Sequence, residues 1–258
     1  MRTLPPSFLS EYSFEPGPGG GWFYRGLRIQ AEVTTHQLAA QWAFSNLDPG
    51  ARILDLATGE GALAQQLSDL GFDVSCTSWD GRSRAQTKCY KIDLDHAFPA
   101  NAVGDHPFDA VMAVEIIEHV ENPAQLLRSC RGVLRDQGSL FLSTPNVESA
   151  RARLQWLVRG QPLWFAGDEV TRNRHISMMW RDQLDFFLSQ SGFSVTERPL
   201  VCDVRSLSGE RGPRGMLKRV VYGLIARLGS GEPIGDTRIY VARASAAVRQ
   251  ASEQNNFY

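Results

Sequence analysis

The residues of this sequence whose types and spacing can do chemistry gather in one short run, Glu115–His119. Glu115 and Glu118 are three residues apart and His119 is four residues after Glu115, so one helical turn brings the three side chains together. Two carboxylates and an imidazole can hold a divalent cation, although two oxygens and one nitrogen do not define which cation. The other interpretation is structural, in that Glu118 and His119 cap and orient a loop. The run follows an apolar stretch, residues 108–114, that is typical of a buried strand.

A second candidate site is the glycine turn within Arg52–Ala64. Here an apolar strand is followed by Gly59 and Gly61 and then by an amphipathic helix, which predicts a pocket for a dinucleotide or for S-adenosylmethionine. The turn fits the dinucleotide pattern G-x-G-x-x-A, and Asp80 lies close to the ~20-residue offset of a ribose-binding acid. Against a dinucleotide, the sequence has no Tyr-x-x-x-Lys, which removes one common arrangement for hydride transfer.

Alternating strand and helix patterns position these two runs. Strands are predicted near residues 52–57, 73–78, 88–92, 108–114 and 138–143, and helices near 62–70, 81–87, 122–135 and 147–159. Such alternation predicts an α/β fold with a parallel sheet and right-handed crossovers. Further on, a helix at 182–191, a strand at 193–197 and a final strand at 237–244 are expected.

The two ends of the chain differ from this pattern. Residues 1–31 are predicted to form an N-terminal arm and lid. The arm is expected to be loose because it is rich in Pro and Gly, and its aromatic residues are expected to fold back onto another part of the protein. Residues 32–258 form the main domain, with insertions at about 147–180 and 200–235. The second insertion holds a helix whose face at Leu217–Leu228 is apolar and whose flanks are basic. It is either a membrane-surface helix or a helix docked on the domain.

Four stretches carry a resemblance to a known family: Leu54–Gly61, Phe108–Val120, Leu134–Leu140 and Ser143–Asn146. They resemble the class I S-adenosylmethionine-dependent methyltransferases, in the group that includes the ubiquinone-biosynthesis O-methyltransferases and methyltransferase types 11 and 23. The second stretch is also similar to small-RNA 2′-O-methyltransferases. The resemblance implies a Rossmann-like, doubly wound, seven-stranded sheet with helices on both faces, an inserted helix before the last strand, and an antiparallel last strand.

The resemblance also assigns contacts to the cofactor. The residues expected to bind S-adenosylmethionine are Asp55, Ala57, Gly59, Gly61, Asp80, Asp93, Leu94 and Val114. Asp55 orients the glycine turn, the two glycines contact the methionine moiety, and Asp93 accepts from the adenine amine with Leu94 behind it.

Two of these positions depart from the family pattern. Ala57 replaces a glycine of the turn, and Ser78 stands where the ribose-binding acid is expected. Asp80, two residues further on, lies on the same side of an extended strand and is expected to accept from the ribose hydroxyls. Alternatively, Asp80 caps a helix that begins at the next residues. Trp79 either walls the adenine or belongs to the core.

For the run Glu115–His119, the resemblance implies that Glu115, Glu118 and His119 bind Mg²⁺ together with a later histidine, His175. A cation that binds a hydroxyl lowers its pKa and fixes its angle to the methyl group. Without a cation, His119 or His175 acts as the general base, with Glu118 beside them. The other histidines, His36, His96 and His106, follow no partner pattern and are expected at the surface or in loops.

Composition limits the partners. A net charge of −1 over 258 residues gives no general attraction to nucleic acid, so no extended nucleic-acid surface is expected. Arginines and aromatic residues in Arg151–Phe165 suit an amphiphilic or anionic small-molecule or lipid-linked acceptor, such as a quinol, phenol or glycan. The alternative is that these aromatics pack on the sheet edge.

The expected location is cytoplasmic, with peripheral contact to a membrane. The N-terminus has no apolar core like that of a signal peptide, and no apolar run approaches the ~18 residues of a membrane span. The widely spaced cysteines, Cys76, Cys89, Cys130 and Cys202, are expected as free thiols. Three functions stay open: an O-methyltransferase for a small or lipid-linked molecule, an RNA 2′-O-methyltransferase, and a dinucleotide-binding oxidoreductase.

Overall fold

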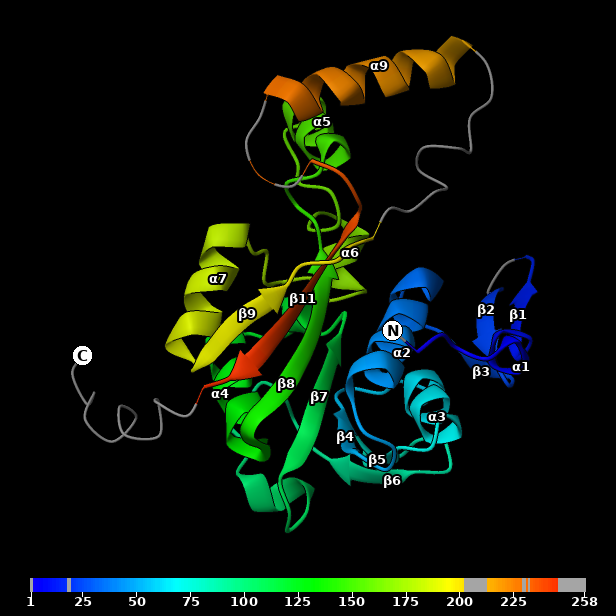
Figure 1. Ribbon diagram of the computed structural model, residues 1–258. Helices are drawn as coiled ribbons and strands as arrows, with labels where there is room; N and C mark the ends of the chain where they lie inside the picture. The colour runs from blue at the N-terminus through cyan, green and yellow to red at the C-terminus, as the bar shows by residue number, and fades with distance from the viewer. Residues whose placement is uncertain (1, 18–19, 202–212, 229–230, 232, 246–258) are drawn as a thin grey trace, which may run out of the picture.

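The computed structural model describes residues 2–17, 20–201, 213–228, 231 and 233–245. Its centre is one sheet in the order β6–β5–β4–β7–β8–β11, with β9 and β10 along the outer edge of β11 (Figure 1). The strands are β4 (Arg52–Asp55), β5 (Asp73–Ser78), β6 (Lys88–Lys91), β7 (Phe108–Val114), β8 (Leu134–Pro145), β9 (Phe193–Glu197), β10 (Leu200–Val201) and β11 (Thr237–Ala244). Strands β4 to β8 pair in parallel, and β11 is antiparallel to β8. The strand order reverses between β4 and β7, which is where open α/β sheets bind their ligands.

Strands β9 and β10 are two parts of one edge strand. Glu197 of β9 pairs with Val241, and Leu200 of β10 pairs with Arg238, so the same register continues along β11. Only Arg198 and Pro199 interrupt the pairing, and proline has no N–H to donate to a ladder. The sheet therefore has seven strand positions, and the prediction of a seven-stranded sheet with an antiparallel last strand is confirmed.

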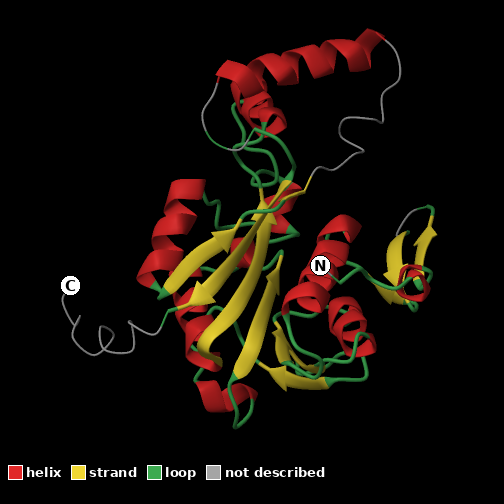
Figure 2. Ribbon diagram, viewed as in Figure 1, coloured by secondary structure: helices red, strands yellow, loops and turns green. Residues whose placement is uncertain are grey.

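Helices cover both faces of the sheet (Figure 2). One core unites α2 (Val33–Asn46) and α3 (Ala62–Asp69) with one set of strand side chains, and a second core unites α4 (Pro123–Val133) and α7 (Arg181–Gln190) with the other set. Ile53 and Leu54 are neighbours on β4 yet belong to opposite cores, because successive strand side chains point to opposite faces. Burial of both faces explains why these strands are apolar throughout, and the doubly wound arrangement is confirmed.

The helix predicted at residues 81–87 is wrong, because this segment is a bent loop between β5 and β6. Its backbone amides bond to the glycine turn and to α3: Arg84 N–H donates to the Glu60 carbonyl and Gln86 N–H to the Gln65 side chain. A helix would have used these N–H groups for its own internal hydrogen bonds, so the segment does not form one.

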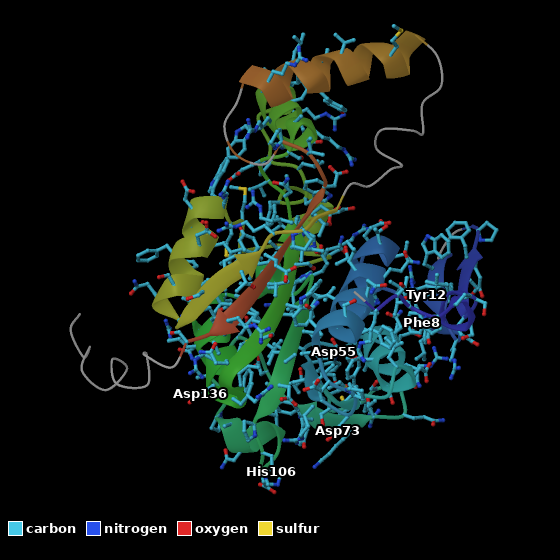
Figure 3. The ribbon with its side chains drawn as sticks, viewed as in Figure 1. Phe8, Tyr12, Asp55, Asp73, His106 and Asp136 are labelled. Carbon is cyan, nitrogen blue, oxygen red and sulfur yellow. The ribbon has the colours of Figure 1, made fainter. Side chains whose placement is uncertain are left out.

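The N-terminal arm is a folded element and not a loose one over most of its length. It consists of α1 (Pro6–Leu9) and a three-stranded antiparallel sheet of β1 (Tyr12–Glu15), β2 (Gly21–Tyr24) and β3 (Leu27–Arg28). The rings of Phe8 and Tyr12, labelled in Figure 3, lie 5.9 Å apart, and both pack on the ring of Tyr24. The Tyr24 hydroxyl donates to Asp69 at 2.9 Å, and Arg25 pairs with the same carboxylate at 3.2 Å. These contacts fix the arm to the end of α3.

The segment between β8 and β11 adds further helices. They are α5 (Ala150–Arg159), α6 (Asp168–Thr171) and α9 (Pro213–Leu228), in addition to α7. Two 3₁₀ turns, Ala100–Val103 and Ile117–His119, lie earlier in the chain, before β8. Helix α9 contacts α5 at one end of the molecule (Figure 1). Among the described residues, none of the helices combines the length and the apolar character that crossing a bilayer requires. Cys76 and Cys130 are buried free thiols and Cys89 is half-buried, whereas Cys202 lies outside the described residues.

A buried charged pair ties this segment to the sheet. Arg238 of β11 is 1% exposed, and its guanidinium lies 3.0 Å from the Glu148 carboxylate and donates to Asn146 Oδ1 at 3.0 Å. Glu148 also accepts from the Arg181 N–H at the start of α7 at 2.8 Å. One carboxylate therefore connects the end of β8, β11 and α7.

Replacing Arg238 with Met should lower the free energy of unfolding by about 3–5 kcal/mol, because it leaves the Glu148 carboxylate buried without its counter-charge. The control is Arg243→Met on the same strand, where the guanidinium donates to the Gln137 carbonyl in a half-exposed position; it should change the stability by less than about 1 kcal/mol. Urea unfolding of both variants measures the difference. Equal effects of the two substitutions would contradict the importance of the buried pair.

Candidate functional site

A cavity of about 1030 Å³ opens at the carboxyl ends of the strands, on both sides of the gap between β4 and β7. Its walls come from the glycine turn, the loops after β5, β6 and β7, the junction of β3 and α2, and residues 169–175. All but one of the residues predicted to bind cofactor or cation line it. The exception is Gly61.

The glycine turn begins where β4 ends at Asp55. Ala57, Gly59 and Gly61 all have left-handed backbone angles, with φ of 50°, 58° and 97°. The alanine holds its conformation because its N–H donates to Thr77 Oγ1 at 3.0 Å. Gly61 starts α3 beneath the loop after β5, and a Cβ there would lie 2.4 Å from Ser83 Oγ. Gly61 is therefore needed for packing, whereas Gly59 is open to the cavity.

Asp55 is a buried acid on the cavity floor. Its carboxylate accepts from the Thr58 hydroxyl at 2.6 Å. Burial raises the pKa of Asp55 to about 7, which the hydrogen bond from Thr58 only partly offsets. Asp55 therefore keeps its proton to a much higher pH than an ordinary aspartic acid does.

At the predicted ribose position, Asp80 closes a turn. Ser78 Oγ donates to Asp80 Oδ1 at 3.0 Å, and Arg82 N–H donates to the same oxygen at 3.0 Å, so the pKa of Asp80 is lowered chiefly by the Arg82 N–H and also by the Ser78 hydroxyl. No helix begins after it, which makes the helix-capping alternative wrong. One carboxylate oxygen is engaged in the turn, and Asp80 still lines the cavity. Trp79 is 81% exposed at the rim, so its assignment to the core is also wrong.

The predicted adenine contacts lie along the same rim. Asp93 accepts from the Asp95 N–H at 3.1 Å and lies 3.1 Å from His96 Nδ1. Leu94 and Val114 line the cavity as half-buried apolar side chains. This wall therefore offers apolar surface with a carboxylate at its edge.

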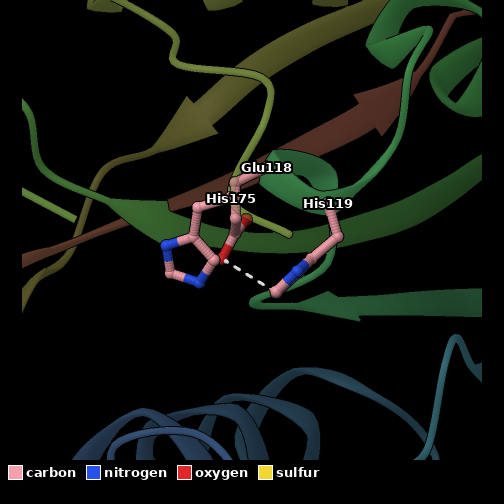
Figure 4. Close-up of side chains that lie close together, drawn as sticks. All are labelled: Glu118, His119 and His175. Carbon is pink, nitrogen blue, oxygen red and sulfur yellow. Dashed lines mark ion pairs between the residues drawn. The ribbon is translucent and has the colours of Figure 1, made fainter. Parts of the chain in front are cut away.

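Glu118, His119 and His175 come together in a cluster in which one ligand atom from each lies within 4.8 Å of the others (Figure 4). A 3₁₀ turn, Ile117–His119, presents the first two side chains. His175 is distant in sequence, and it lies beside them because the N–H groups of Ile176 and Ser177 both donate to the Glu118 carbonyl at 2.9 Å. The imidazole rings of His119 and His175 meet edge to face, with centroids 4.7 Å apart.

Burial favours the neutral forms of Glu118 and His119. Glu118 is fully buried, and burial followed by repulsion from Glu115 raises its pKa well above the usual range. The pKa of His119 is lowered by burial and then by His175. The 3.9 Å between Glu118 Oε1 and His119 Nε2 is too long for a hydrogen bond. Among the described residues Glu118 Oε1 has no partner.

Glu115 does not belong to this cluster. Its carboxylate accepts from the Ser143 hydroxyl at 2.8 Å, and burial raises its pKa to about 7. Glu115 lines the cavity beside the cluster, and its own backbone is left-handed, with φ of 48°. Of the four residues predicted to bind a cation, the fold thus brings three together and leaves Glu115 next to them.

The sequence-based prediction missed His36, which was expected at the surface. It is 7% exposed, lies in α2 and lines the cavity, and burial lowers its pKa to about 4. A signal was present, because Val33, His36, Ala40 and Ala43 recur at the spacing of one helical face. Gln30 and Glu32, just before α2, also line the cavity and were not predicted.

The charge of the lining favours a cationic ligand. Its acidic side chains outnumber its arginines even without the three acids whose pKa is raised: Glu32, Glu60, Asp80, Asp93, Asp95 and Glu169 against Arg28, Arg82, Arg172 and Arg174. The pyrophosphate of a dinucleotide carries negative charge, and S-adenosylmethionine carries a positive sulfonium. Coulombic interaction with these walls therefore disfavours the dinucleotide.

Comparison with known proteins agrees with this choice. The sequence profile of the methyltransferase-domain family matches residues 16–198. The chain therefore belongs to this family, and it is an S-adenosylmethionine-dependent methyltransferase. The match gives no support to the alternative of a dinucleotide-binding oxidoreductase.

The chain is also similar to curated relatives and to a solved structure. The ubiquinone biosynthesis O-methyltransferase of Dinoroseobacter shibae is 29% identical over 167 residues, which are 56% of this chain and 67% of that protein. The enzyme of the same name from Caulobacter vibrioides is 34% identical over 105 residues, or 38% of this chain and 42% of that protein. The chain thus spans less than half the length of this second relative. A methyltransferase from Archaeoglobus fulgidus has the same fold, with a TM-score of 0.56 at 16% identity over 84% of this chain and 96% of that chain.

Asp55→Asn should make the protein more stable than the wild type above pH 7, by up to about 4 kcal/mol. Asp55 has a folded pKa of about 7 against 3.8 for the ordinary group. Between pH 4 and pH 7, Asp55 keeps its proton in the folded protein but loses it in the unfolded chain. The free energy of unfolding of the wild type therefore falls as the pH rises from about 4 to about 7. Denaturant unfolding across this range measures the difference between variant and wild type.

The control is Asp48→Asn in the exposed turn before β4. Its difference from the wild type should not grow with pH, because a solvated carboxylate carries no burial cost. A pH-independent effect of Asp55→Asn would contradict the raised pKa.

Proposed function

We propose that the protein transfers a methyl group from S-adenosylmethionine to a hydroxyl oxygen of a small or lipid-linked acceptor, of the quinol, phenol or glycan class. The observation that carries this proposal is the cluster of Glu118, His119 and His175 inside the cofactor cavity. Transfer to oxygen requires that a weakly acidic proton be removed as the bond to carbon forms. The imidazoles of His119 and His175, which line the cavity, can accept that proton.

The chain's own groups account for the proton transfer. His175 Nδ1 lies 2.9 Å from the Trp164 carbonyl, so this nitrogen carries the proton and Nε2 is left as an acceptor. His119 is neutral because its pKa is lowered. When bound, S-adenosylmethionine supplies an electrophilic methyl group whose departure turns the sulfonium into a neutral thioether. Without a cation, the acceptor hydroxyl gives its proton to one of the two imidazoles, which passes it to solvent.

We also propose that the same three side chains bind a divalent cation. Supporting this, Glu118 Oε1 is buried and has no partner among the described residues, while Thr144 holds Oε2 at 3.1 Å. The hydrogen bond from His175 Nδ1 to a backbone carbonyl is the kind of contact that orients metal-binding histidines. A bound cation would lower the pKa of an acceptor hydroxyl.

The acceptor class is supported by the loop that carries Trp164 and Phe165. The Phe165 ring lies 5.6 Å from the His175 ring, and the Arg151 guanidinium lies 5.7 Å from the Trp164 ring. Aromatic and basic groups thus stand next to the cluster, which suits an aromatic or amphiphilic acceptor. The names of the relatives from ubiquinone biosynthesis also support a phenol or quinol. The acidic cavity walls do not favour the phosphate backbone of RNA.

We further propose that a lipid membrane is where the acceptor is met. The surface that supports this is an apolar ridge on α5 and α9: Trp156, Leu157, Val158, Met216, Val220 and Leu224, all of them exposed. Neither helix contains an acidic residue, and α5 carries Arg151, Arg153 and Arg159. Apolar surface flanked only by basic residues suits an interface with anionic lipid. Helix α5 is followed in the chain by the loop with Trp164 and Phe165, which contacts His175.

Glu118→Gln should weaken the binding of Mn²⁺ and reduce turnover by roughly 100-fold, because an amide oxygen is a poor substitute for an anionic ligand. Titration calorimetry with Mn²⁺ measures the first effect and methyl transfer to a catechol probe the second. Glu121→Gln, an exposed neighbour, serves as the control and should leave both unchanged. If Glu118→Gln left cation binding and turnover at wild-type levels, the cluster would be structural.

Leu157→Glu should abolish flotation with vesicles that contain anionic lipid, since it places a charge in the apolar ridge. Leu157 is 82% exposed, so the fold should be unaffected. Phe186→Glu on α7 is a matched change at another exposed apolar residue and should still float. Turnover of a water-soluble acceptor should be the same in both variants. Flotation of the Leu157 variant like that of the wild type would exclude the ridge as the contact.

A further inference from the structure

Two cysteines, Cys76 on β5 and Cys89 on β6, lie directly opposite each other in the sheet. They are partners in the register of this parallel strand pair, and registered neighbours point to the same face. Cys76 is a buried member of the core that unites α2 and α3 with the sheet, and Cys89 packs against that core as a half-buried side chain. Both are free thiols in the structure, and the reaction proposed above uses neither.

The spacing of the two strands suits a covalent bond between these cysteines. Neighbouring strands lie about 4.8 Å apart. This distance falls within the ~4.4–6.8 Å that separates the Cα atoms of a disulfide. Strand β6 is the last strand on its side of the sheet, and among the described strands it pairs only with β5. A small shift of β6 that brings the sulfur atoms together therefore breaks no second strand ladder.

The two thiols differ in how a reagent from solvent reaches them. Cys89 is half-buried, so a small molecule can contact its sulfur. Cys76 is 0% exposed, and burial together with a hydrogen bond to the Cys89 thiol raises the pKa of Cys76 to about 12. A thiol reacts as the thiolate, so Cys76 is unreactive toward solvent reagents. The pair thus consists of an accessible thiol and a protected one beside it.

The pair lies behind the two loops that are predicted to hold the ribose and the adenine of the cofactor. Ser78 Oγ lies 3.4 Å from Cys89 Sγ, and the same hydroxyl donates to Asp80 at 3.0 Å. The Ser78 carbonyl accepts from the Ile92 N–H at 3.0 Å, just before Asp93. Movement of the Cys89 sulfur therefore acts on both loops through Ser78.

We propose that Cys76 and Cys89 form a disulfide when the protein meets a low-molecular-weight disulfide, and that this bond weakens the binding of S-adenosylmethionine. The Cys89 thiolate attacks the small disulfide and displaces one small thiolate, which leaves a mixed disulfide on Cys89. The Cys76 sulfur then attacks the Cys89 sulfur and displaces the second small thiolate, which takes up the Cys76 proton. The two protein thiols thus lose two electrons and two protons, and the small disulfide becomes two thiols.

The new bond changes the support of the ribose loop. A disulfide holds its sulfur atoms about 2.0 Å apart, so the Cys89 sulfur is drawn toward Cys76 and away from the Ser78 hydroxyl. The loop that carries Asp80 then loses one of its contacts to β6. The reduced protein is the form that binds the cofactor tightly. This inference rests on the use of S-adenosylmethionine and not on the acceptor proposed above.

Peptide mapping tests whether the bond forms. The whole protein is incubated with oxidised glutathione, its remaining thiols are alkylated, and it is digested with trypsin. Arg82, Arg84 and Lys88 lie between the two cysteines, so trypsin separates them unless a disulfide joins their peptides. Mass spectrometry should find the Cys76 and Cys89 peptides linked, with a mass lower by two hydrogen atoms than their sum. Dithiothreitol should release the two peptides.

Titration calorimetry with S-adenosylhomocysteine measures the effect on the site. The oxidised wild type should bind roughly 10-fold more weakly than the reduced wild type, as expected for the loss of about one hydrogen bond, and dithiothreitol should restore the affinity. Cys89→Ser keeps a polar atom near Ser78 and should bind equally well before and after treatment. Cys130→Ala, at a buried cysteine on α4, is the matched control and should respond to the oxidant as the wild type does.

Two results of the mapping would overturn the proposal: Cys76 and Cys89 without a link after treatment, or a link from either of them to another cysteine. A linked protein that binds S-adenosylhomocysteine as the reduced protein does would also overturn it. So would a Cys89→Ser variant that loses affinity on treatment to the same extent as the wild type. Because these measurements involve no acceptor, each outcome is independent of the proposed methyl transfer to oxygen.

Discussion

One carbonyl oxygen holds the two halves of the site together. The Glu118 carbonyl accepts from Ile176 and Ser177, and the Ser177 hydroxyl adds a bond to the Val120 carbonyl at 2.6 Å. After β8 the chain leaves the sheet to form α5 and the aromatic loop, and these bonds determine where it returns. His175 therefore meets Glu118 and His119 in a fixed position. The same bonds bring the aromatic loop next to the cofactor cavity.

Two residues with strained backbones and two acids with raised pKa values lie on the two sides of the gap between β4 and β7. Ala57 follows β4 and Glu115 follows β7, and both adopt left-handed conformations that cost about 1 kcal/mol or more for a residue with a Cβ. Asp55 and Glu115 are buried there with raised pKa values. Core packing on both faces of the sheet stabilises these unfavourable features. They persist at the one place where the strand order leaves a crevice, as expected for a site that a ligand completes.

The sequence predicted the sheet well because strands buried on both faces are apolar throughout, and this signal is local. Spacing alone predicted that Glu115, Glu118 and His119 converge, but only Glu118 and His119 do, because the 3₁₀ turn that presents them begins at Ile117, after Glu115. His175 followed only from the resemblance, since its position depends on hydrogen bonds between distant segments. The loop at 81–87 was wrongly predicted as a helix because its amides bond to Glu60 and Gln65, which are neighbours only in the folded chain. His36 was missed for a different reason. The helical pattern places His36 on the buried face, but no partner pattern in the sequence indicated that a histidine would be buried there.

The charges of the cavity also give the reaction a direction. Burial raises the pKa values of Asp55, Glu115 and Glu118, so these groups hold their protons to a higher pH than they would in water. A positive sulfonium among these groups favours their ionised forms, and the attraction grows as they lose protons. Methyl transfer removes that positive charge, so the same walls hold the spent cofactor less strongly than the methyl donor. An acidic lining at the switch point of the sheet thus both selects a cationic cofactor and assists the release of its neutral thioether product.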